Sequence, residues 1–171
     1  MIRMVGAGLV VLSAGAVGFG YARGVRLQYT QLEGLVWCMD YMKSEISTRL
    51  TPLPVLFSML GGCQQKDVGA FFEEAGRALS QPPGCTIPVA FKRALQKYSA
   101  FAPGEDAVQA LYGLAMGLGR FELESQLAAI EACLRTLDTL RLSLQAQKKT
   151  RCKSYETIGI CAGLALAVIL L

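Results

Sequence analysis

The stretch LESQLAAIEACLRTLDTLRLSL, residues 123–144, decides the fold class of this chain, because its apolar residues recur at helical spacing. Leucine or isoleucine stands at positions 123, 127, 130, 134, 137 and 144, and Arg141 interrupts the repeat. This four-three spacing places apolar side chains on one face of a helix. From Glu122 onward nothing breaks the pattern, so we expect the helix to run on into the C-terminal segment. A helix of roughly fifty residues would be a rod of about 75 Å.

Five stretches rich in proline or glycine divide the preceding region into segments of helical length. They are residues 51–54, 61–62, 81–84, 102–104 and 117–119. Between them, apolar residues recur every three or four positions, as in the set Leu32, Leu35, Val36, Met39, Met42 and Ile46. Thr86 is predicted to cap the fourth helix, with Pro88 in its first turn. No run alternates apolar and polar residues as a strand would, so the sequence predicts an all-α fold, a six-helix cytoplasmic bundle flanked by two transmembrane helices.

The N-terminal segment has the length of a membrane helix. Residues 4–22 carry no charge and lie between Arg3 and Arg23, and nineteen helical residues span about 28 Å. Small residues recur at Ala14, Gly18 and Ala22, a pattern that favours close helix packing. The alternative is a signal peptide cleaved after Ala14-Gly15-Ala16. Cleavage there would leave an extracytoplasmic helical binding module tethered by its C-terminus.

The C-terminal segment repeats the pattern over a shorter length. Residues 157–171 are uncharged, and fifteen helical residues reach only about 22 Å. Gly159 and Gly163 offer a close-packing face, whereas a buried core helix is the alternative at this length. The predicted organisation is therefore an anchor over residues 1–23, a bundle over 24–153 and a second membrane helix over 154–171 that continues the last bundle helix.

The distribution of charge gives the orientation. The chain has 17 Lys and Arg against 13 Asp and Glu, a formal charge of +4, and sixteen of the basic residues lie between the two apolar segments. The positive-inside rule therefore places the middle domain in the cytoplasm. The six cysteines form no C-x-x-C pair, and reduced thiols agree with that compartment. The basic run at 148–153 adjoins a membrane segment, so we expect it to face lipid rather than nucleic acid.

The sequence holds no recognisable catalytic motif. It has no histidine and no phosphate-binding loop, and its cysteines lack metal-site spacing. Glu122 and Glu124 are two residues apart at a helix start, where they point to different faces and complement the dipole. Lys43, Ser44 and Glu45 are interpreted as a solvated helix face. We therefore expect a protein that is not an enzyme and binds no cofactor or metal.

The break before the last helix is the candidate interaction or packing joint. Its residues are Leu118, Gly119, Arg120, Glu122 and Gln126. If the backbone packs closely at Gly119, a bulky residue there should be the most damaging change.

These residues resemble the stage III sporulation protein AB family over essentially the whole chain. The resemblance rests first on the layout of anchor, helical domain and anchor. It rests next on Glu45-Ile46 followed by Leu50-Thr51-Pro52-Leu53-Pro54 and Phe57, and then on Leu118-Gly119, Glu122, Gln126 and Tyr155-x-x-x-Gly159 with Gly163-Leu164. The family usually has aspartate where this chain has Glu122, which is a conservative departure.

The resemblance implies a membrane component of the apparatus between mother cell and forespore. The family's cytoplasmic domain is similar to that of the type II secretion platform protein F, a six-helix bundle that sits against a hexameric ATPase. By that analogy the chain would lie in the mother-cell membrane during sporulation. It would dock the stage III sporulation ATPase, protein AA, and meet other stage III sporulation membrane proteins, with self-association left open.

Overall fold

The computed structural model describes the backbone of residues 2–81, 84–119 and 122–170, and side chains over 23–81, 84–119 and 122–146. These ranges contain six α-helices and no strand. In chain order they are α1 (Ile2–Arg49), α2 (Leu53–Leu60), α3 (Lys66–Ser80), α4 (Ile87–Lys97), α5 (Glu105–Leu118) and α6 (Leu123–Leu170). The prediction of an all-α fold with six helices is confirmed. Thr86 stands at the N-cap of α4 with Pro88 in the first turn, although its side chain makes no capping hydrogen bond.

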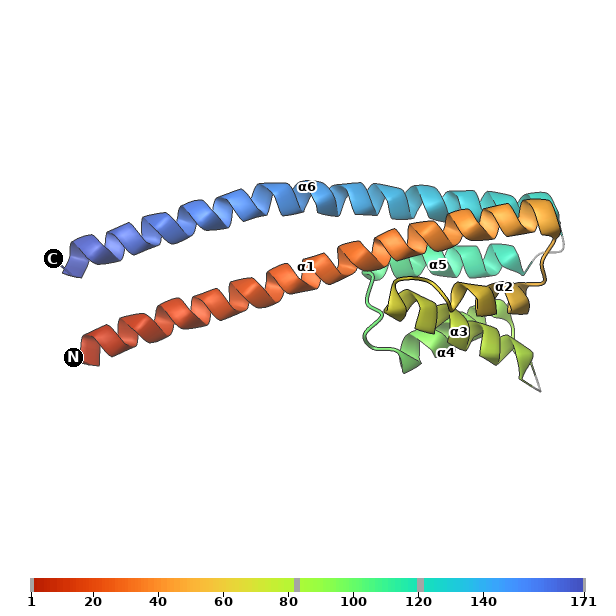
Figure 1. Ribbon diagram of the computed structural model, residues 1–171, viewed down its shortest axis with the longest axis horizontal. Coiled ribbons are helices and arrows are strands. Elements are labelled where there is room, and N and C mark those ends of the chain that lie inside the picture. Colours follow the sequence, from red (N-terminus) through yellow and green to blue (C-terminus); the bar gives the residue numbers. More distant parts are fainter. Residues whose placement is uncertain (1, 82–83, 120–121, 171) are drawn as a thin grey trace.

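The first and last helices are the longest, at 48 residues each. α1 is one uninterrupted helix, so the predicted N-terminal anchor and the first bundle helix are continuous. Both helices extend beyond the bundle toward the same side (Figure 1). Among the residues searched, those with described side chains, no helix is long and apolar enough to cross a membrane. The predicted spans 4–22 and 157–171 lie outside those residues, as does their small-residue set Ala14, Gly18, Ala22, Gly159 and Gly163.

The helices pack in a closed ring around one core. α1 packs against α6, α6 against α5, and α5 against α4, while α3 lies between α4 and α2. Contacts of α1 with α2 and α3 complete the ring. Figure 1 shows α1, α5 and α6 as one layer and the shorter α2, α3 and α4 as a second layer beneath them. The core is aromatic at its centre, where Phe57, Phe71, Phe72, Phe91 and Phe101 are buried.

Helical periodicity predicted most of this core. Of the face expected for α1, Val36 is half-buried, and the buried members are Leu32, Leu35, Met39, Met42 and Ile46. On α6, Ile130 and Leu137 are fully buried, whereas Leu123 at the start of the repeat is 39% exposed. Arg141 interrupts the repeat at low cost because its guanidinium pairs with Asp138, 2.7 Å away on the same helix.

One buried polar side chain, Gln31, was not predicted. Its amide nitrogen donates to Asp67 Oδ2 at 3.0 Å and to the carbonyl of Ala100 at 2.7 Å. Its oxygen accepts from the backbone N–H of Ala102 at 3.0 Å. Gln31 is fully buried and ties α1 to the start of α3 and to the α4–α5 loop. It stands four residues before Leu35 on the apolar face of α1, and this position was the signal in the sequence.

We expect Gln31→Leu to lower the free energy of unfolding by about 2 kcal/mol, because it leaves buried hydrogen-bonding groups unpaired. Thermal or denaturant unfolding of the full-length protein in detergent measures the change. Gln64→Leu, at an exposed position, is the matched control and should unfold within about 0.5 kcal/mol of the unmodified chain. Equal stability of the two variants would contradict the role given to the buried amide.

The four cysteines whose side chains are described are all free thiols. Burial raises the pKa of Cys133 to about 12. Burial also raises the pKa of Cys38, and the neighbouring Cys63 thiol adds to that shift. Both thiols are therefore protonated near neutral pH and pack as small apolar groups.

Candidate interaction site at the distal end of the bundle

Two segments that are far apart in the sequence, around Leu50 and around Gln126, meet in space. The turn between α1 and α2 and the start of α6 lie at the end of the bundle opposite the outward-extending helices, called here the distal end (Figure 1). There they line a groove of about 140 Å³, the distal groove. Its lining residues are Ile46, Leu50, Thr51, Leu123 and Gln126.

A buried carboxylate shapes the α1–α2 side of this groove. Glu45 is only 7% exposed, so the interpretation of a solvated helix face is wrong for this residue. Its carboxylate accepts from the Thr51 hydroxyl at 3.0 Å and from Arg49 Nη1 at 3.1 Å. Glu45 therefore holds the turn against the last turn of α1. α1 ends at Arg49, before the left-handed Leu50, and Pro52 disfavours any helical continuation at Thr51.

Leu50, in the turn between α1 and α2, combines an unfavourable backbone conformation with an exposed apolar side chain. Its φ is +52°, a left-handed backbone that L-residues with a branched side chain rarely adopt. Its side chain is nevertheless 69% exposed, so burial does not offset the strain. In the sequence Leu50 is marked only as part of a motif, and neither property is visible there.

The α6 side of the distal groove begins at Glu122, just before the helix. The Glu122 carboxylate accepts from the Ser125 hydroxyl at 3.2 Å, and its carbonyl accepts from the backbone N–H of Gln126 at 3.1 Å. These bonds close the first turn and place half-buried Gln126 on the groove wall. Arg120, predicted as part of the joint, lies outside the described residues.

The close approach behind the groove occurs at Gly117 and not at Gly119. A Cβ on Gly117 would overlap the Ala129 side chain on α6. A Cβ on Gly119 would have its nearest atoms at 3.8 and 3.9 Å, which is ordinary contact, and its φ of −74° suits any residue. The expectation that a bulky residue at Gly119 would be the most damaging change required close backbone packing there, and the structure shows none. Leu118 between them is buried in the α5 face of the core.

Nothing in the described part of the distal end carries recognisable chemistry. Among the residues searched, no group of three histidine, cysteine or acidic side chains could hold a metal ion. The groove joins two exposed leucines to the polar side chains of Thr51 and Gln126. Such a mixture of apolar and polar groups suits a protein contact better than a small charged substrate.

Fold and site together define a six-helix bundle with two long terminal helices and an exposed, partly apolar groove at the far end. Residues 3–171 match the family model described as Stage III sporulation protein AB. The chain therefore belongs to the stage III sporulation protein AB family, as its motifs indicated.

A solved structure of stage III sporulation protein AB is similar to the chain, with a TM-score of 0.62. The two share 20% sequence identity, and the match covers 70% of this chain and 94% of the other. At that identity the likeness shows the fold alone. No match was found among curated proteins.

Proposed function

We propose that the chain is a non-enzymatic membrane platform of the stage III sporulation apparatus and that its distal end docks the cytoplasmic stage III sporulation ATPase. Family membership supports the sporulation role. The resemblance of the family's domain to the type II secretion platform is the reason for choosing an ATPase as partner.

Leu50 is the observation that carries the docking proposal. The backbone of Leu50 is strained and its large apolar side chain is exposed, so the residue contributes little to folding. Backbone strain and exposed apolar side chains are typical of functional sites. Leu123, 39% exposed, lies on the opposite wall of the same groove. A partner that covers both leucines would gain the apolar burial that the isolated chain does not have.

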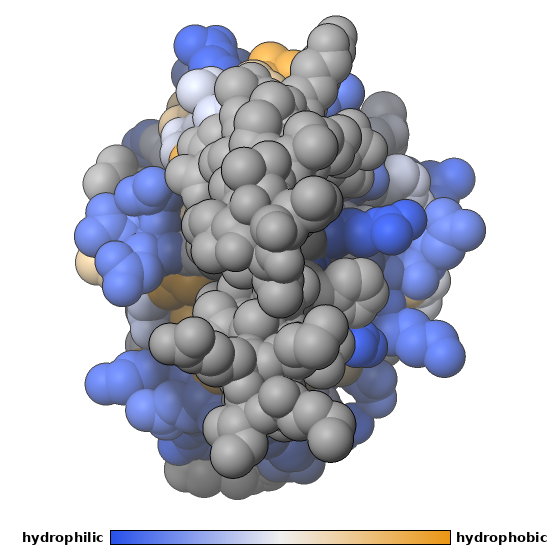
Figure 2. Space-filling view, turned by 90° about the vertical axis from the view of Figure 1, so that its left-hand side faces the viewer, coloured by the Kyte–Doolittle hydropathy of each residue, from blue (hydrophilic) through white to orange (hydrophobic). Residues whose placement is uncertain are grey.

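Three features support anchoring at the opposite end. α1 and α6 extend to the same side (Figure 1), and the apolar runs 4–22 and 157–171 belong to those extensions. The described surface of the bundle facing that side is mostly hydrophilic (Figure 2), as expected of a bundle that stays outside the bilayer while its two extensions enter it. A platform with its membrane helices at one end presents its distal groove away from the bilayer, where a soluble ATPase has access.

Affinity purification of the tagged full-length protein from sporulating membranes tests the proposal. We expect the ATPase to co-purify and the protein to resist carbonate extraction. Deleting residues 24–150 should abolish ATPase recovery, whereas replacing both apolar segments with unrelated membrane helices should preserve it. Recovery of extracytoplasmic proteins alone, with an intact mass lacking residues 1–16, would overturn the proposal in favour of a signal-cleaved, tethered binding module.

A further inference from the structure

A second surface lies on the side of the bundle, along the exposed face of α1. Glu33, Trp37 and Asp40 stand there at helical spacing and are called the α1 stripe. Beside them is a groove of about 770 Å³, whose opposite wall is the α2–α3 turn, Gly62 to Gln65. Trp37 and Leu50 are thirteen residues apart on or just after α1, about 20 Å at helical rise, so this surface is separate from the distal groove.

Trp37 is the tryptophan that dominates this surface, and it is the only one in the chain. Its side chain is 50% exposed although tryptophan is the largest apolar residue. The indole stacks on Tyr41 with ring centroids 5.4 Å apart and planes at 16°. The Tyr41 hydroxyl in turn contacts Met59 Sδ on α2 at 3.9 Å. The indole is thus supported on one face by the bundle, which pre-organises it for a partner.

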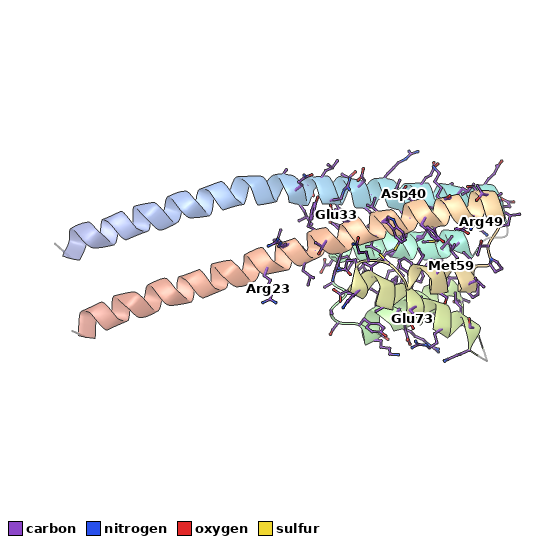
Figure 3. The ribbon with its side chains drawn as sticks, viewed as in Figure 1. Arg23, Glu33, Asp40, Arg49, Met59 and Glu73 are labelled. Atoms are coloured by element: carbon purple, nitrogen blue, oxygen red, sulfur yellow. The ribbon has the colours of Figure 1, made fainter. Side chains whose placement is uncertain are left out.

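Two carboxylates flank the indole. Glu33 precedes Trp37 by one helical turn and Asp40 follows it by one turn, so the carboxylates are about 10 Å apart along α1. Figure 3 labels both on the part of α1 that belongs to the bundle. Glu33 accepts a hydrogen bond from Tyr29, and this bond raises the pKa of the Tyr29 hydroxyl.

Several other carboxylates of the bundle already form ion pairs within the chain. Glu131 forms an ion pair with Lys43 across α1 and α6 at 2.7 Å, and Glu73 pairs with Arg77 at 2.9 Å. Among the described side chains, no ion pair involves Glu33 or Asp40. The α1 stripe therefore offers two carboxylates to a cation from outside the chain.

Gly34 keeps the neighbouring groove narrow at its base. A Cβ on Gly34 would lie 2.8 Å from Gln65 Cβ and 3.2 Å from Val68 Cγ2. Only a glycine at this position lets the α2–α3 turn approach α1 so closely. The turn then forms a wall beside Trp37 instead of covering it.

We propose that the α1 stripe docks a basic helix of a partner protein, with one guanidinium over the Trp37 indole and others paired with Glu33 and Asp40. Arginine suits this surface because its planar cation stacks on an aromatic face and pairs with carboxylates. A helix that lies along α1 with arginines seven residues apart matches the spacing of the two carboxylates. The platform would then have two docking surfaces, one at the distal end and one on its side.

Tryptophan fluorescence of the full-length protein in detergent tests this proposal, because all of the signal comes from Trp37. The probe is an alanine-based helical peptide with arginines at positions i, i+3 and i+7. We expect saturable quenching by this peptide and affinity about tenfold weaker for the same peptide with neutral citrulline in place of arginine.

The double variant Glu33→Gln, Asp40→Asn should bind the arginine peptide about tenfold more weakly, since it removes two exposed ion pairs. Glu105→Gln with Glu124→Gln, which neutralises two exposed carboxylates elsewhere, is the matched control and should bind as the unmodified chain does. Equal affinity for the arginine and citrulline peptides, or an unaffected stripe variant, would overturn the proposal. So would a stripe variant that changes only the oligomeric state, because the occupant would then be a second copy. A Leu50 variant keeps the stripe intact, so failure of distal docking and failure at the stripe are distinguishable.

Discussion

Leu50→Asp is expected to abolish recovery of the sporulation ATPase with the tagged full-length protein while leaving the bundle folded. Aspartate tolerates the left-handed backbone better than leucine does, so the turn itself should not be disrupted. Placing a charge at the centre of an apolar contact removes a hot-spot interaction of about 2–4 kcal/mol, which is a loss of thirtyfold or more in affinity. Quantitative co-purification from sporulating membranes measures the effect.

Leu50→Gly separates the two properties of this residue. Glycine adopts the φ of +52° without strain, so this variant should be about 1 kcal/mol more stable than the unmodified chain. It should still lose ATPase recovery, because the apolar side chain is gone. A more stable protein with weaker docking would show that the strain at Leu50 is retained for binding.

Leu142→Asp is the matched control for these variants. Leu142 is also exposed, at 54%, but lies on α6 about 28 Å from Leu123 at helical rise. This control should recover the ATPase normally. Normal recovery with Leu50→Asp would show that the partner does not dock at the distal groove.

Periodicity predicted the elements of this fold well because each helix buries one face against the same core. Leu35, Met39 and Ile46 on α1 are buried as their spacing required. The spacing could not show that α1 continues through Arg23 without a break, since a charged residue at a membrane boundary fits either one helix or two. The spacing places Gln31 on the apolar face of α1, but it could not show what pairs with the buried amide, because the three partners come from α3 and from the α4–α5 loop.

The candidate site was less predictable than the fold because it depends on contacts between distant segments. The sequence marked Leu118 to Gln126 and the stretch around Leu50 as separate motifs. Only the antiparallel packing of α1 and α6 brings Leu50 and Gln126 to one groove. Glu45 was misinterpreted for a related reason, since its partner Thr51 lies beyond the end of the helix, where helical spacing no longer applies.

At the α5–α6 joint, too, the sequence could not predict which residue makes the close contact. Two glycines stand two residues apart at the end of α5, and the sequence does not distinguish them. The structure does, because a Cβ on Gly117 would overlap the Ala129 side chain, whereas a Cβ on Gly119 would meet its nearest atoms at ordinary contact distance.

Gly117→Leu is expected to lower the free energy of unfolding by about 3 kcal/mol or more, because even its Cβ overlaps Ala129 and α5 and α6 must separate. Gly119→Leu should remain within about 0.5 kcal/mol of the unmodified chain. Unfolding of the full-length variants in detergent, followed by circular dichroism, measures both. If Gly119→Leu proves the more damaging change, the assignment of the close approach to Gly117 is wrong.

Exchanging the methyl group between the two helices tests the cause of the expected loss. Gly117→Ala alone should be destabilising, and Ala129→Gly alone should cost about 1 kcal/mol through helix propensity. Together they restore one methyl group to the interface, so the double variant should be more stable than the sum of the single changes predicts. Because α6 carries both Leu123 at the distal groove and the C-terminal extension, we expect the single variants to weaken ATPase recovery and the double variant to restore it. Recovery of stability without recovery of docking would instead show that the position of the methyl group itself matters to the partner.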